Sequence, residues 1–112
     1  MSNEASGNIV VSGEPDNVCD FIQKHSALPD GYQPWENEGY EAISCFNLYN
    51  DFCPDFWVSA SKEYLGLKLI VKYQLGLASA HRYVVESGTL TENTRFDWEK
   101  GDVYKWVQWF NF

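Results

Sequence analysis

The sequence has few cysteines and few basic residues, and each shortage excludes a class of protein. Its three cysteines, Cys19, Cys45 and Cys53, form no C-x-x-C pair and are odd in number. We therefore expect reduced, buried thiols and neither a disulfide framework nor a zinc site. Eight lysines and arginines stand against sixteen aspartates and glutamates, giving a net charge of −8. Because binding to phosphates draws on clustered basic side chains, we expect no direct contact with nucleic acid.

Long apolar runs and standard catalytic motifs are missing as well. No segment approaches the ~20 apolar residues of a membrane helix, and the polar residues 1–7 do not resemble a signal peptide. The expected location is the cytoplasm. There is no phosphate-binding glycine loop, H-E-x-x-H, EF-hand loop or G-x-S-x-G, and Ser59 to Lys62 matches S-x-x-K without its companion motifs. We predict no enzymatic activity, no cofactor and no metal.

Apolar residues are plentiful by contrast, at 45% of the chain, with 17% aromatic. That is enough apolar surface for one core in a chain of 112 residues. We predict a single domain over residues 1–112, with residues 1–7 flexible.

The first half of the chain alternates strand and helix signals. The β-branched run Asn8 to Gly13 predicts a strand, and Glu14 with Pro15 predicts a helix start. Residues 26–40 contain prolines, glycines and aromatics and predict a long ordered loop. A second strand is expected from Glu41 to Tyr49.

The second half predicts a helix, a strand and a hairpin. Pro54 opens a helix to about Tyr64, and strict alternation predicts a strand from Leu67 to Tyr73. Ser87 and Gly88 form a turn between strands at 80–86 and 89–96. The tail from Asp97 is rich in aromatics and fits a helix or a final strand, serving as core or as a dimer surface.

This order predicts an α+β fold of the ferredoxin-like kind: a two-layer sandwich with a mainly antiparallel sheet, two helices on one face and an aromatic-rich C-terminal extension. Several segments point the same way: Asn8 to Gly13, Phe46 to Asn50, Cys53 to Trp57, Ser61 to Tyr64, Leu67 to Tyr73 and Glu86 to Gly88. On these residues the sequence resembles the ferredoxin-like domain of the Api-like family of phage- and plasmid-encoded proteins, over nearly the whole chain.

Some family features are absent here. The Trp-Gly-x-Lys-Trp stretch before the second strand is not present, Asp55 replaces the usual second proline, and the aromatic tail differs. The resemblance implies no catalytic residues. It implies an origin on a mobile element and a location in the host cytoplasm, where small acidic proteins often inhibit host defence.

The negative charge is concentrated in the first half of the chain. Residues 1–63 hold eleven acids and two bases, whereas residues 64–112 hold five acids and six bases. Such a surface serves solubility, or it forms a face for a basic partner. On the second interpretation the partner-binding residues are Glu14, Asp16, Asp20, Asp30, Trp35, Glu36, Glu38, Glu41, Asp51 and Asp55, with Trp35 either an exposed anchor or a pin that holds the loop to the core.

The favoured function is therefore an inhibitor that binds a basic protein surface, such as the nucleic-acid site of a CRISPR effector or nuclease. One alternative is a structural or regulatory module that forms a homodimer through the aromatic C-terminus. Another is an uncharacterised enzyme that uses Ser59 or a cysteine–histidine pair.

Overall fold

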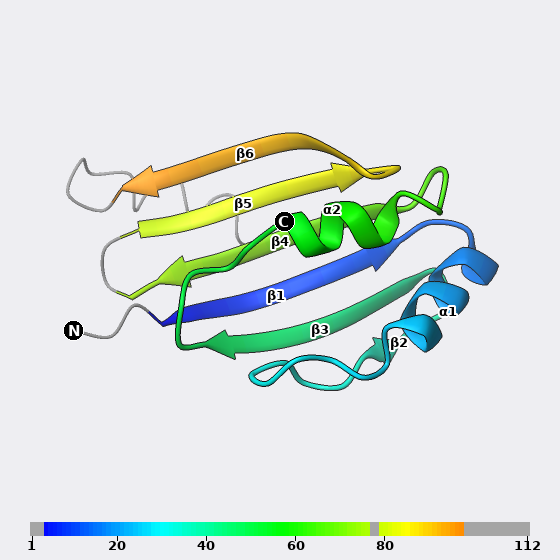
Figure 1. Cartoon of the computed structure of the whole chain (residues 1–112), viewed down its shortest axis with the longest axis horizontal. Helices are drawn as coiled ribbons and strands as arrows, with labels where there is room; N and C mark the ends of the chain where they lie inside the picture. The colour runs from blue at the N-terminus through cyan, green and yellow to red at the C-terminus, as the bar shows by residue number, and fades with distance from the viewer. Residues whose placement is uncertain (1–3, 77–78, 98–112) are drawn as a thin grey trace.

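The computed structural model describes residues 4–76 and 79–97, which form a six-stranded antiparallel sheet and two helices (Figure 1). The order across the sheet is β2-β3-β1-β4-β5-β6. The strands are β1 (Ala5–Ser12), β2 (Glu36–Asn37), β3 (Glu41–Leu48), β4 (Lys68–Leu75), β5 (Ser79–Glu86) and β6 (Thr89–Asp97). The helices are α1 (Pro15–Lys24) and α2 (Asp55–Ser61).

β1 lies inside the sheet and is antiparallel to both of its neighbours, β3 and β4. Side chains alternate across a strand, so Ile9 and Val11 point to the same face and are fully buried there. Leu69 and Val71 of β4 continue this buried face beside them. The alternation that predicted the strand at 67–73 thus marks the core side of the sheet.

The hairpin of β5 and β6 turns on Ser87 and Gly88, whose φ angles are 49° and 80°. Two successive positive φ angles define the tight turn whose twist matches that of paired strands. The Ser87 Oγ accepts a hydrogen bond from the Gly66 N–H at 2.8 Å, and the Ser87 N–H donates to the Leu67 carbonyl at 3.0 Å. These bonds fix the hairpin turn to the start of β4.

The two helices share one aromatic cluster. Val18, Phe21 and Ile22 form the buried stripe of α1, and Trp57 is buried on α2. The Phe21 ring lies 6.3 Å from Trp57 and 5.5 Å from Tyr64, between ring centroids. Aromatic packing therefore holds the helices against each other as well as against the sheet.

The expected ferredoxin-like two-layer sandwich is wrong. The structure is mostly antiparallel sheet, and its two helices have only ten and seven residues. α1 joins antiparallel neighbours instead of crossing between parallel strands, and the β5–β6 hairpin extends the sheet beyond β4. Figure 1 shows α1 at one end of the sheet, next to β2, and the short α2 in front of the middle strands, so the two helices do not lie side by side as a continuous second layer.

Several element boundaries also differ from those predicted. β1 begins at Ala5, so residues 5–7 belong to the sheet and are not a flexible end. α2 ends at Ser61, and Tyr64 lies in the turn that follows. The two-residue β2 was not expected. The expectations for the aromatic tail, from residue 98 onward, lie outside the described residues.

Candidate functional site

A pocket of about 420 Å³ opens between the segment that follows β3, the loop before β2 and the start of α2. Its lining consists mainly of aromatic, asparagine and acidic side chains, with no lysine or arginine among the described residues. The residues are Pro29, Asp30, Gly31, Tyr32, Asn47, Leu48, Tyr49, Asn50, Asp51, Cys53, Phe56 and Trp57.

Backbone hydrogen bonds hold the loop of the pocket against the outer edge of β3. The Asn47 N–H donates to the Gly31 carbonyl, and the Gln33 N–H donates to the Cys45 carbonyl, both at 2.8 Å. Gly31 has a φ of 97°, and a Cβ there would lie 2.6 Å from the Asn47 carbonyl oxygen. Only glycine permits this close approach without strain. The loop thereby carries Tyr32 to within 5.8 Å of Trp57, between ring centroids.

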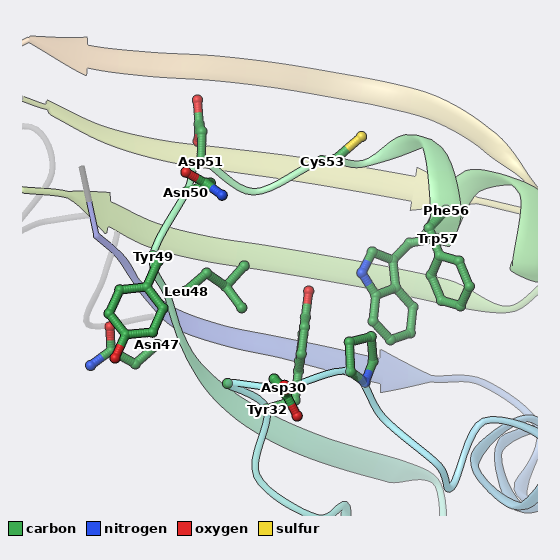
Figure 2. A pocket seen from close by; sticks show the side chains of 12 residues that line it. Asp30, Tyr32, Asn47, Leu48, Tyr49, Asn50, Asp51, Cys53, Phe56 and Trp57 are labelled. Atoms are coloured by element: carbon green, nitrogen blue, oxygen red, sulfur yellow. The ribbon is translucent and has the colours of Figure 1, made fainter. Parts of the chain in front are cut away.

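Two of the aromatic residues at the pocket are exposed to solvent. Tyr49 is 86% exposed and Phe56 is 50% exposed, whereas Trp57 is only 2% exposed. Figure 2 shows Tyr49 on one side of the pocket and Phe56 with Trp57 on the other, with Tyr32 and Asp30 coming from the loop. Exposed aromatic surface that converges on one pocket is typical of a binding site.

The pocket also contains two carboxylates, Asp30 and Asp51. The Asp51 Oδ1 accepts two hydrogen bonds, one from the backbone N–H of Phe52 and one from the Tyr73 hydroxyl, both at 2.8 Å. Burial raises the pKa of Tyr73, so this hydroxyl remains protonated and keeps donating. Asp51 is thus held in place, while Asp30 is exposed on the loop and forms no ion pair within the described residues.

Four of the other predicted partner-binding acids lie at the opposite end of β3. Glu14 and Asp16 stand at the start of α1, and Glu38 and Glu41 flank the turn between β2 and β3. The Gly13 N–H donates to the Tyr40 carbonyl at 3.2 Å and so joins these two segments. Six of the nine predicted acids therefore form two groups, and only Asp30 and Asp51 line the pocket described above.

The remaining predicted residues have mostly structural contacts. Asp20 accepts a hydrogen bond from the Tyr64 hydroxyl at 2.6 Å. The Trp35 indole donates to the His25 carbonyl at 3.1 Å, and its ring lies against Phe21 and Trp57, so Trp35 pins the loop to the core.

Two acids of the predicted set lie beside pockets. Glu36 of β2 lines a smaller pocket of about 320 Å³, to which Trp35 and Cys45 also contribute. Asp55 is exposed at the first position of α2, directly before Phe56.

The thiols and hydroxyls offer little for catalysis. Cys45 and Cys53 are exposed, contrary to the expectation of buried thiols. The Ser79 Oγ and the His81 Nε2 lie 3.0 Å apart, a distance suited to a nucleophile and its base, but Ser79 is fully buried and a substrate could not reach it. No group of three potential metal ligands occurs within residues 4–76 and 79–97.

Charge was the sequence signal that found Asp30 and Asp51, and it missed Tyr49 and Phe56. An aromatic residue directly before turn-forming residues, as in Tyr49-Asn50-Asp51, is the pattern that could have indicated an exposed aromatic side chain. Across the described part of the chain, neither helix is long and apolar enough to cross a membrane. Compared with models of protein families, with curated proteins and with solved structures, this chain matches none.

Proposed function

We propose that this protein is a non-catalytic binding protein whose pocket receives a basic segment of another protein. The observation that carries the proposal is the convergence of exposed aromatics, Tyr49 and Phe56, with the carboxylates of Asp30 and Asp51 around one pocket. Aromatic faces and carboxylates both attract cationic side chains. A basic segment would therefore gain apolar contact and charge neutralisation at the same place.

Two basic side chains of the described residues form ion pairs away from this pocket. Lys68 pairs with Glu86 at 3.6 Å, and Arg82 pairs with Glu92 at 3.3 Å. By strand alternation, Lys68 and Arg82 lie on the sheet face away from the helices, opposite the buried Leu69 and Val85. The charged residues that line the pocket are Asp30 and Asp51, and their negative charge would speed encounter with a basic partner.

We further propose that the partner is a nucleic-acid-binding protein of a host defence system, a CRISPR effector or a nuclease being the favoured class. Support comes from the acidic surface, which can occupy a basic channel built for phosphates. In a competition assay, nucleic acid and this protein would then exclude each other from the partner. Simultaneous binding of both would contradict this part of the proposal.

The binding function can be tested with a fluorescent peptide of arginine and lysine residues, using anisotropy. We expect Asp30→Asn to weaken binding about fivefold, since a charge-assisted contact contributes about 1 kcal/mol at an exposed site. Raising the salt from about 50 to about 500 mM should weaken wild-type binding further, because the Debye length shrinks.

Asp16→Asn is the matched control, because Asp16 is also exposed but stands at the start of α1, at the other end of β3. It removes the same unit of net charge without touching the pocket. If Asp16→Asn and Asp30→Asn weaken binding equally, only the overall charge matters and the pocket is not the site.

A further inference from the structure

We infer that the pocket selects arginine, taking one guanidinium group from an extended segment of the partner. This inference rests on the proposed function and names the side chain that the pocket recognises. A guanidinium is planar, weakly hydrated and able to stack on an aromatic ring while its edge donates two hydrogen bonds to a carboxylate. A lysine ammonium is a strongly hydrated point charge and gains less from the same surroundings.

The aromatic residues supply surfaces for stacking. Phe56 meets Trp57 edge to face, with 5.0 Å between ring centroids and 89° between ring planes, so the two rings form a corner. Tyr49 stands on the other side of the pocket (Figure 2) and is almost fully exposed. Burial raises the pKa of Tyr32 at the pocket, so its phenol stays neutral. A guanidinium entering here meets aromatic side chains at both walls.

The carboxylates supply the hydrogen-bond acceptors. Both bonds that Asp51 accepts fall on its Oδ1, and within the described residues its Oδ2 accepts none. Because Tyr73 and the Phe52 N–H fix this carboxylate, little conformational freedom is lost when a ligand binds to Oδ2. Asp30 lies on the loop before β2, whose backbone is hydrogen-bonded to Asn47 and Cys45 of β3. Two carboxylates thus line one pocket, and no described lysine or arginine is among its lining residues.

The size of the pocket sets the length of segment that it can hold. About 420 Å³ lies within the range of about 300–1,000 Å³ that small-molecule pockets occupy, so there is room for an arginine side chain and part of its neighbours. The occupant is therefore a single arginine in an extended segment. A helix presenting a whole basic face would be too wide to enter.

The test compares three peptides of one extended sequence that differ at a single position: arginine, lysine or the neutral isostere citrulline. We expect the arginine peptide to bind about three- to tenfold more tightly than the lysine peptide, and the citrulline peptide to bind most weakly. Tyr49→Ser should abolish the preference for arginine over lysine, since Tyr49 supplies an exposed wall. Its exposure means that the fold does not depend on it.

Cys53 reports whether the peptide sits in this pocket, because it is exposed and lines it. Cys45 is also exposed but lines the smaller pocket, so it serves as an internal control. Bound arginine peptide should slow alkylation of Cys53 severalfold and leave the rate at Cys45 unchanged. Protection of both thiols, or of Cys45 alone, would place the peptide elsewhere and overturn the inference.

The outcomes separate this inference from the proposed function. Equal binding of the arginine and lysine peptides, still weakened by Asp30→Asn, would leave the proposed function standing and refute arginine selectivity. Failure of all three peptides to bind would refute both. Arginine preference combined with protection of Cys53 would support both.

Discussion

At the scale of a single residue, Gly7 shows how closely the strands of this sheet approach. It lies in β1 opposite Phe46 of β3 and Tyr73 of β4, on the face that carries Ile9. A Cβ at this position would clash with the Lys72 carbonyl oxygen and lie 2.5 Å from the Tyr73 Cα. The neighbouring atoms belong to the backbone of a paired strand, so they cannot move aside.

We therefore expect Gly7→Ala to destabilise the protein by about 3 kcal/mol, at the upper end of what overpacking costs. Urea unfolding followed by tryptophan fluorescence measures this loss as a lower midpoint at an unchanged slope. Ser12→Ala at the other end of β1 serves as the control and should change the free energy of unfolding by less than about 0.5 kcal/mol. Stability of Gly7→Ala equal to that of the control would show that β1 and β4 are not paired in this register.

Sequence reasoning could not foresee the role of Gly7. The residues Ala5, Ser6 and Gly7 have no β-branched side chain, so local propensity assigned them to a flexible end. They form a strand because β3 and β4 offer hydrogen-bond partners on both sides. Ile9 and Val11, by contrast, were recognisable from their own pattern as a buried strand.

At the scale of elements, local patterns predicted most of the strands but not their arrangement. The observed β3, β4 and the β5–β6 hairpin agree with the predictions within about two residues. Which strands pair with each other is a long-range property of the fold. No local sequence pattern shows that β1 lies between β3 and β4, as observed, rather than in the strand order of a ferredoxin-like sheet. The pocket was equally out of reach, because residues 29–32 and 47–57 meet only in the fold.

A buried tyrosine hydroxyl contributes to the contact between α1 and the turn after α2, beside the Lys24–Glu63 ion pair and the packing of Tyr64 on Phe21. Tyr64 is 7% exposed, and its hydroxyl donates to Asp20, whose carboxylate raises the pKa of Tyr64 to about 12. Removing the hydroxyl leaves the ring in the Phe21 cluster and deletes only the hydrogen bond. We expect Tyr64→Phe to lower the free energy of unfolding by about 1 kcal/mol, measured in urea.

Asp20→Asn is the informative companion to that variant. An asparagine keeps an acceptor oxygen for the Tyr64 hydroxyl, so we expect a smaller loss of stability than in Tyr64→Phe. The double variant should lose less than the sum of the two single losses, because Asp20→Asn weakens this hydrogen bond only while the Tyr64 hydroxyl is present. Strict additivity would show that the two side chains are not in contact.

At the scale of the whole molecule, two histidines with lowered pKa values make the stability depend on pH. His81 is 6% exposed, and burial is the main cause that lowers its pKa, with Arg95 adding to the effect and Asp51 opposing it. Burial likewise lowers the pKa of His25, with Lys24 adding to the effect and Glu63 opposing it. Both histidines are therefore neutral in the folded protein at pH values where the unfolded chain already binds protons.

The sign of the pH effect follows from this difference. Below the ordinary histidine pKa of ~6.5, the unfolded state takes up protons that the folded state does not. The free energy of unfolding therefore decreases as the pH is lowered, until the pKa values of the folded state are reached. We expect the urea midpoint to decrease when the pH is lowered from about 7.5 to about 5.5. The urea midpoint of a His25→Gln/His81→Gln variant should depend less on pH, whatever its absolute stability. A midpoint in the parent protein that is constant or rises on acidification would contradict the lowered pKa values of the two imidazoles.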